Sequence, residues 1–129
     1  MKVIERTVTV LPEHLDHLNH VNNISYVKWV QDIAIKHWEI NLTEEIRNLF
    51  YWVLIEHNIK YKGEAFLGDT INIKTYIKSN TAVTSIRKVE MRLQKNDKLI
   101  IDSETNWCLI STVSKKPTRI TQEILDIFS

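Results

Sequence analysis

The sequence predicts an α+β fold in which one long central helix is wrapped by a curved antiparallel sheet of about five strands. Residues 24–38 show helical spacing with a broad apolar surface, whereas the chain before and after them alternates polar and apolar residues with a period of two. Only two glycines and two prolines occur, which favours long strands joined by Asn/Asp turns. Because helix and sheet both have apolar surfaces to cover, the simplest arrangement curls the sheet around the helix.

The first strand and the loop after it come from residues 3–23. Val8 and Val10 alternate with threonines, which is typical of a strand with one covered face, and Pro12 ends this pattern. Residues 13–23 are polar and carry three of the five histidines. We expect this segment to be a loop that leads directly into the long helix.

The long helix is expected over residues 24–38. Lys28 and Asp32 recur at helical spacing, while apolar side chains fill most of the remaining circumference. Such a helix is normally surrounded, with one narrow polar stripe in contact with water. Asn22 or Asn23 is well placed to cap its first turn.

Downstream of the long helix, the pattern predicts mostly strands. Val53, Ile55 and His57 belong to an alternating run that ends at Tyr61, so they should point to one face. A polar turn over residues 95–98 joins two later runs and makes their pairing antiparallel. The other expected elements are a short helix over 43–49, strands over 71–78, 82–94 and 99–112, and a final helix over 121–128.

Composition limits the class of protein. Of the 129 residues, 43% are hydrophobic and 26% are charged, which predicts one globular domain over residues 1–129. The net charge of +1 gives no reason to expect a nucleic-acid or membrane partner. The single cysteine, Cys108, cannot form an internal disulfide, and we recognise no targeting or membrane-spanning stretch. We therefore expect a cytoplasmic protein.

The segment from Asp16 to Trp29 gathers an acid, imidazoles and amides in a loop that opens the long helix. The first backbone N–H groups of a helix have no partners within it and carry partial positive charge. A carbonyl oxygen aimed at them would be polarised, and a nearby carboxylate could attack the carbonyl carbon or activate water. Taken alone, Asp16 is more simply interpreted as a loop residue that accepts backbone hydrogen bonds.

The same segment resembles the motif of the hotdog-fold thioesterases of the 4-hydroxybenzoyl-CoA thioesterase type. Their hallmark is Asp-x-x-Gly-His-Val-Asn-Asn followed by an aromatic residue in the central helix. The matching residues here are Asp16, His20, Val21, Asn22, Asn23 and Tyr26. The resemblance extends to residues 59–61, 68–71 and 117–124, so it covers essentially the whole chain.

The resemblance implies a hotdog fold and hydrolysis of an acyl-CoA or acyl-carrier-protein thioester. It makes Asp16 the catalytic carboxylate, as nucleophile or general base, and places the carbonyl-polarising amides near Asn23, Ile24 and Ser25. It implies no metal and no prosthetic group, with coenzyme A entering only as part of the substrate. It also implies that two sheets join edge to edge with substrate across the interface, in a homodimer or homotetramer.

Further site residues follow from the resemblance or from their positions. His20 and Asn23 are assigned to the catalytic group with Asp16, because they would shape the loop, orient the carboxylate or hold a water molecule. Arg119 belongs to a basic cluster that is a candidate for the phosphates of coenzyme A, although a solvated charge run is the simpler interpretation. The expected substrate contacts are Asn22, Ile24, Ser25, Tyr26, His57 and Arg119.

Two positions depart from the family pattern. Asn19 replaces the glycine before the histidine, and asparagine tolerates a left-handed backbone better than other non-glycine residues. Gln31 stands where relatives often place glutamate, which puts a second carboxylate at that point in doubt. Glu56 and His57 are alternative partners, and strand alternation sends them to opposite faces, so at most one should reach the site.

Three alternatives stay open at this stage. One is a non-catalytic acyl-binding protein on the same fold. A second is a hydratase or dehydratase of acyl thioesters, for which His57 is the only strand histidine available. A third is a metal site made by His14, His17 and His20, but their spacing is helical whereas the segment is expected to be a loop.

Overall fold

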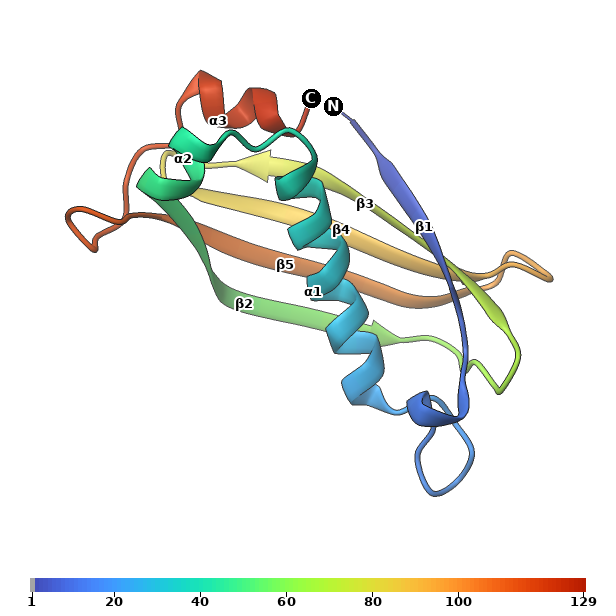
Figure 1. Cartoon of the computed structure of the whole chain (residues 1–129). Coiled ribbons are helices and arrows are strands. Elements are labelled where there is room, and N and C mark those ends of the chain that lie inside the picture. Colours follow the sequence, from blue (N-terminus) through green and yellow to red (C-terminus); the bar gives the residue numbers. More distant parts are fainter. Residues whose placement is uncertain (1) are drawn as a thin grey trace.

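The computed structural model describes residues 2–129 as a five-stranded antiparallel sheet and a long helix. The sheet order is β1-β3-β4-β5-β2, which leaves β1 and β2 at the edges (Figure 1). The predicted α+β architecture is therefore confirmed. The elements are β1 Ile4–Thr9, the 3-10 turn η1 Pro12–His14, α1 Asn23–Ile40, α2 Glu44–Leu49, β2 Phe50–Tyr61, β3 Thr70–Asn80, β4 Thr84–Leu93, β5 Leu99–Ser111 and α3 Gln122–Ile127.

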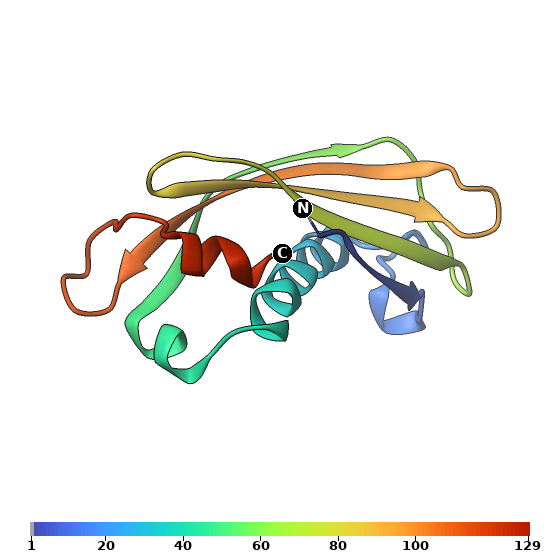
Figure 2. The same cartoon turned by 90° about the horizontal axis from the view of Figure 1, so that it is seen from above.

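The sheet curves over α1, and seen from above the helix lies beneath its concave face (Figure 2). Val30 and Ile33 on α1 are fully buried, and they belong to the same core as the inward-facing residues of β3, β4 and β5. The predicted caps of the two short helices are also present. Thr43 accepts the N–H of Ile46 at 3.2 Å, and Thr121 accepts that of Ile124 at 3.4 Å.

Strand β2 differs from the predicted alternation. The pairing of β2 with β5 shifts register between Leu54 and Glu56, so Ile55 is an additional residue in the strand. A bulge of one residue reverses the side-chain alternation beyond it. Leu54 therefore lies on the half-buried side with His57, whereas Val53 and Ile55 are 40% and 54% exposed. The prediction that Val53 and Ile55 share the face of His57 was wrong for this reason.

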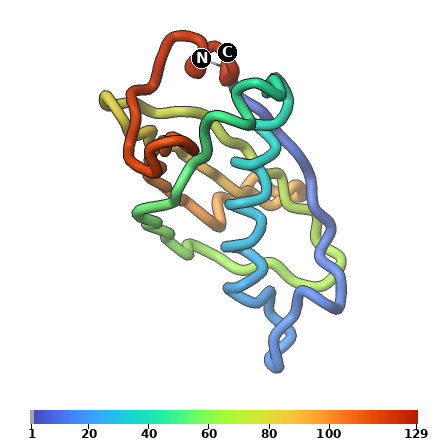
Figure 3. The backbone as a smooth tube through the Cα atoms, turned by 60° about the vertical axis from the view of Figure 1, so that its left-hand side comes forward, coloured from blue at the N-terminus to red at the C-terminus, as the bar shows by residue number. Residues whose placement is uncertain are grey.

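The two ends of α1 have different surroundings. Its N-terminal half packs in the main core, whereas its C-terminal half meets a second cluster built around α3 and the segment before it. Phe128 stacks near both His37 and Trp38, with ring centroids 5.0 Å and 5.6 Å apart. Figure 3 shows this C-terminal segment (red) at one end of the molecule and the loop before α1 (blue) at the other.

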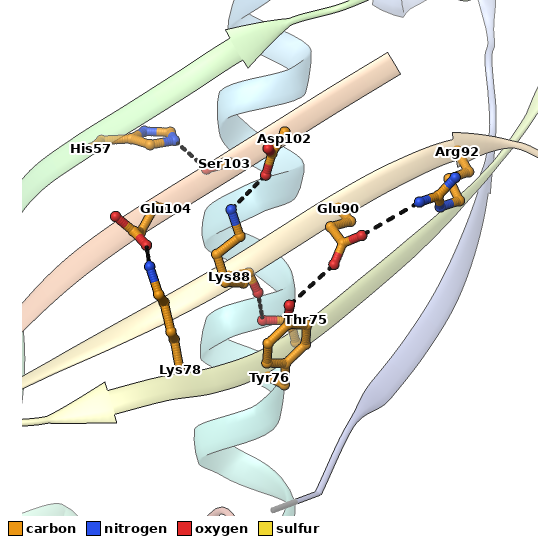
Figure 4. Close-up of polar contacts among 10 residues, drawn as sticks. All are labelled: His57, Thr75, Tyr76, Lys78, Lys88, Glu90, Arg92, Asp102, Ser103 and Glu104. Carbon is orange, nitrogen blue, oxygen red and sulfur yellow. Dashed lines mark hydrogen bonds and ion pairs between the residues drawn. The ribbon is translucent and has the colours of Figure 1, made fainter. Parts of the chain in front are cut away.

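The convex face of the sheet carries a network of charged side chains (Figure 4). Lys88 pairs with Asp102 at 2.6 Å and Lys78 with Glu104 at 2.8 Å, each across neighbouring or next-nearest strands. These pairs keep the outer face of the sheet polar. Within residues 2–129, no helix is long and apolar enough to cross a membrane.

Candidate active site

The loop before α1 is closed by its own backbone. The N–H of Asp16 donates to the carbonyl of His20 at 2.8 Å, and that of Asn19 donates to the carbonyl of Asp16 at 3.1 Å. Asn19 makes the turn with φ of 63°, in the left-handed region where asparagine replaces glycine at modest cost. The expectation that Asn19 can keep the turn of the family motif is confirmed.

The carboxylate of Asp16 also holds this loop. Its Oδ1 atom accepts the backbone N–H groups of Leu18 at 2.8 Å and His20 at 3.1 Å. The Leu18 hydrogen bond is the main reason that the pKa of Asp16 lies below its ordinary value. Its Oδ2 atom accepts no hydrogen bond from the described part of the chain. Asp16 is therefore ionised at neutral pH, with one oxygen occupied by the loop and one available.

The first turn of α1 offers a single unpaired amide. Asn22 is the cap, because its Oδ1 atom accepts the N–H of Ile24 at 3.0 Å, and its carbonyl accepts that of Ser25 at 2.9 Å. The N–H of Asn23, the first helical residue, has no acceptor among residues 2–129. The expectation that the amides of Ile24 and Ser25 can also polarise a carbonyl is corrected, since both are already bonded.

The side chain of His20 contacts the segment between β2 and β3. Its Nδ1 atom lies 3.1 Å from Oε1 of Glu64, and its ring packs edge-on against Phe66 at 5.5 Å. Its backbone bonds Asp16 twice, because its N–H donates to the Asp16 carboxylate and its carbonyl accepts the Asp16 N–H. Glu64 was not identified from the sequence, because it lies in an irregular segment about forty residues from the motif.

Tyr26 fixes the same irregular segment against α1. Its side chain is only 3% exposed, and its hydroxyl oxygen accepts the N–H of Ala65 at 3.1 Å. Burial raises the pKa of Tyr26, so its hydroxyl stays neutral. Ser25 is also tied down, since its hydroxyl donates to the carbonyl of His14 at 3.4 Å. The hydrogen bonds of Tyr26 and Ser25 therefore fix the backbone around the site. Ile24, which is 75% exposed, is the residue of this helix turn that presents an apolar surface.

The structure does not bring His57 and Arg119 to the loop. His57 is half-buried on the inner face of β2 and exchanges a hydrogen bond of 2.8 Å with Ser103 (Figure 4). Burial lowers its pKa. Arg119 is exposed and belongs to the segment just before α3. Figure 3 shows the C-terminal segment (red) at the opposite end of the molecule from the loop before α1. His57 and Arg119 were both predicted as substrate contacts, and within one chain neither meets Asp16.

Two other candidates, Asp32 and His14, have local partners. Asp32 pairs with Lys28 at 2.8 Å on the exposed side of α1. The Nδ1 atom of His14 accepts the N–H of Leu11 at 2.9 Å, and its ring packs on Trp29 at 5.0 Å. In residues 2–129 no three His, Cys, Asp or Glu side chains come together as a metal site would require.

A cavity of about 340 Å³ lies farther along α1. It is bounded by the C-terminal half of the helix, the start of β2, and inward-facing residues of β4 and β5. Gln31 is among its lining residues, and tryptophan and phenylalanine contribute five of the twelve. The cavity is large enough to hold a small organic group.

Comparison with known proteins identifies the family. The family model for the thioesterase-like superfamily matches residues 10–128. The chain belongs to this superfamily. The match confirms the predicted resemblance and the assignment of this enzyme as a thioesterase. A comparison with curated proteins found no match.

Solved structures confirm that this thioesterase has the hotdog fold. YbaW, a probable thioesterase from Escherichia coli, is 19% identical, with a TM-score of 0.86 over 95% of this chain and 94% of that one. A 1,4-dihydroxy-2-naphthoyl-CoA thioesterase from Synechocystis is 14% identical, with a TM-score of 0.86 over 98% and 96%. A hypothetical protein from Staphylococcus aureus in complex with CoA is 19% identical, with a TM-score of 0.87 over 98% and 81%.

Proposed function

We propose that this thioesterase hydrolyses an acyl-CoA thioester with Asp16 as the reacting carboxylate. The observation that carries the proposal is that two groups at this end of α1 are unused. Oδ2 of Asp16 accepts no hydrogen bond and the N–H of Asn23 has no acceptor among residues 2–129, and the loop that holds Asp16 leads directly into the helix that Asn23 begins. A carboxylate beside a free helix N-terminal amide suits attack on a carbonyl whose oxygen becomes negative.

The proposed reaction is the hydrolysis of the thioester carbon–sulfur bond by one water molecule. The Asn23 N–H donates to the thioester carbonyl oxygen while Asp16 either attacks the carbonyl carbon or takes a proton from an attacking water. The carbon–sulfur bond breaks, and the thiolate of coenzyme A leaves and is protonated. In the nucleophilic route, water then cleaves the acyl-aspartyl anhydride. Either route consumes one water and releases a free acid and a thiol.

Coenzyme A is the proposed carrier, and a carrier protein is the alternative. The Staphylococcus aureus neighbour in complex with CoA supports the first, and the 12:0-ACP thioesterase from Umbellularia californica, among the structural neighbours, supports the second. Arg119 remains a proposed phosphate contact only if another subunit brings it near the thioester site, since the C-terminal segment and the loop before α1 lie at opposite ends of one chain (Figure 3).

We propose a homodimer that forms along β2, with a homotetramer as the next assembly. In the described sheet β2 pairs only with β5, so its other backbone edge is available for a second copy. Tyr51, Val53 and Ile55 expose apolar surface beside that edge. An exposed apolar edge strand is a hazard in a monomer and a suitable surface in a symmetric pair.

The second candidate function is acyl-thioester binding without turnover. It is favoured by the presence of only one free amide and by Gln31 in place of a carboxylate. Hydratase or dehydratase chemistry is less well supported, because His57 pairs with Ser103 and not with an acid. That activity would add water to an enoyl thioester without releasing thiol.

The test measures thiol release from short, medium, long and aromatic acyl-CoAs by the native chain, Asp16→Asn and Asp16→Ala. Asparagine keeps an oxygen that can accept the Leu18 and His20 N–H groups, so the loop should survive while the charge is lost. We expect turnover to fall by about 10²–10⁴-fold in Asp16→Asn. Unchanged turnover in this folded variant would exclude Asp16, and acyl-CoA binding with no thiol release would favour the binding protein.

A further inference from the structure

The cavity beside α1 contains a buried arginine. Arg87, on the inner face of β4, is 3% exposed and lines the cavity. Its Nη1 atom bonds Nδ1 of His37 at 2.9 Å and donates to the hydroxyl of Thr75 at 3.0 Å. None of the ion pairs formed by residues 2–129 includes Arg87. Buried charges in proteins are normally paired, so this one is unusual.

The neighbours of Arg87 do not neutralise it. Burial and the adjacent guanidinium lower the pKa of His37 to about 4, so at neutral pH its ring is uncharged and accepts from Arg87. The hydroxyl of Thr75 donates onward to the carbonyl of Lys88 at 2.8 Å, which leaves its lone pairs for Arg87. The Phe128 ring lies 5.3 Å from the guanidinium carbon and offers only a cation–π contact. A full positive charge therefore remains at the cavity wall.

Other hydrogen-bonding groups at the cavity are also unused. The Nε and Nη2 atoms of Arg87 have no acceptor among the described residues. The hydroxyl of Ser85 and the indole N–H of Trp52 are buried without a partner in residues 2–129, and both residues line the cavity. Buried polar groups are normally satisfied, so several free donors around one charge indicate a missing acceptor.

The walls of the cavity define the rest of the ligand. Trp38, Trp107 and Phe128 surround the polar groups with aromatic surface. A small hydrated anion such as phosphate would gain nothing from these walls. A carboxylate attached to a hydrocarbon or an aromatic ring would satisfy both the guanidinium and the apolar surface.

A continuous helix face leads from the thioester site toward this cavity. Ile24, Gln31 and Ile35 lie on one side of α1, because they are spaced by seven and four residues. Gln31 and Ile35 line the cavity, and Ile24 is exposed at the first turn. Gln31 is the eighth residue after Asn23, which places it about 12 Å farther along the helix axis.

We propose that this cavity binds a carboxylate, held by Arg87 with Ser85 and Trp52 as further donors. If the chain hydrolyses thioesters as proposed above, the same site defines the substrate class. The substrates are then thioesters whose acyl group carries a carboxylate at the end away from the sulfur. The acyl chain follows the helix face from Ile24 to Gln31, and its terminal carboxylate reaches Arg87.

Binding is tested without turnover by tryptophan fluorescence, since three of the four tryptophans line the cavity. The native chain is titrated with hexanoate and benzoate and with the uncharged amides of the same acids. We expect saturable binding of the carboxylates and at least tenfold weaker binding of the amides. Arg87→Met, which removes the charge with little change in volume, should weaken carboxylate binding at least tenfold.

Two further variants test whether any loss of binding in Arg87→Met comes from misfolding instead of the lost charge. Ser85→Ala removes one small donor and should weaken carboxylate binding by a few-fold, while Lys88→Met removes a neighbouring cation on the outer face and should leave it unchanged. Equal affinity for acid and amide, no binding of either acid, or native affinity in both Arg87→Met and Ser85→Ala would overturn the carboxylate site.

The acyl chain must be long, because His37, which bonds Arg87, lies 14 residues beyond Asn23, about 21 Å along the helix axis. The substrate class is therefore tested separately by comparing hexadecanedioyl-CoA with hexadecanoyl-CoA. We expect the native enzyme to prefer the hexadecanedioyl thioester in kcat/KM by at least tenfold, and Arg87→Met to lose that preference while still hydrolysing hexadecanoyl-CoA. An equal rate for both thioesters would overturn the substrate class. If carboxylates bind through Arg87 but no thioester is hydrolysed, the hydrolase proposal fails and the carboxylate site stands.

Discussion

The carboxylate of Asp16 accepts the backbone N–H of His20 at 3.1 Å, so the candidate catalytic acid and the histidine of its motif form one hydrogen-bonded loop. The imidazole of His20 is directed instead to Glu64. This histidine therefore positions Asp16 by its backbone, whereas its side chain joins the loop to the segment between β2 and β3.

The acid limb of the pH profile should reflect the low pKa of Asp16. Its hydrogen bonds favour the ionised form, so the carboxylate is active over a wider acidic range than an ordinary aspartate. We expect kcat/KM to stay on its plateau from pH 7 down to about pH 5. The stability that these hydrogen bonds provide is present above the unfolded pKa and is lost as pH falls through the folded pKa. A limb centred near pH 6–7 would point to a different group.

Isotope labelling tests the nucleophilic role of Asp16. Single-turnover hydrolysis in ¹⁸O-labelled water transfers label to the Asp16 carboxylate when water attacks the aspartyl carbonyl of the anhydride, an outcome that only the nucleophilic route allows. When water attacks the acyl carbon instead, as it does in the general-base route, label enters only the product acid. Mass spectrometry of the peptide containing Asp16 measures the difference, and Asp16→Asn provides the unlabelled control.

Tyr26→Phe should destabilise the segment between β2 and β3. The substitution leaves the N–H of Ala65 without its acceptor at a fully buried position. An unsatisfied buried donor costs about 1–3 kcal/mol, which urea denaturation can measure. Thr112→Val, which removes an exposed hydroxyl bonded to the Asn48 carbonyl, is the matched control and should cost less. Equal losses would show that the Tyr26 hydroxyl has no special role.

The stability of the protein should increase between pH 4 and pH 6.5 because of His37. Its pKa is lowered to about 4 in the folded state, against an ordinary value of 6.5, so in this window the unfolded chain binds a proton that the folded chain does not. The full effect is at most about 3 kcal/mol. His37→Gln keeps an acceptor for Arg87 and cannot titrate, so its unfolding free energy should vary less over this window. An identical pH dependence in both proteins would contradict the prediction.

The β2 edge should control assembly. Val53→Lys places a charge on the exposed apolar side of β2, and light scattering after size exclusion should show a smaller assembly than the native one. Leu54→Lys instead buries a charge on the opposite face and should lower the unfolding free energy at any protein concentration. If Val53→Lys leaves the mass of the assembly unchanged, the β2 edge is not the interface.

Much of the fold followed from local patterns. The period of two in β3 and β4 and the apolar faces of the helices depend only on neighbouring residues, and each appeared close to the predicted range. The caps of the two short helices could also be predicted, because a cap depends on a residue only a few positions from the N–H that it accepts. The bulge at Ile55 was not predicted, because an additional residue in a strand is fixed by pairing with β5 and not by the sequence of β2.

For the site, the motif, the loop turn at Asn19 and the family could be predicted from the sequence, because they depend on residues close together in the chain. The three-dimensional packing was needed to show which amide is free, since Asn22 caps the helix and leaves the N–H of Asn23 without an acceptor among residues 2–129. It also decided that Glu64 meets His20 and that Arg87 lies buried without an acidic partner among residues 2–129. Burial and charge compensation depend on contacts between β4, α1 and α3, and no local pattern in the sequence records them.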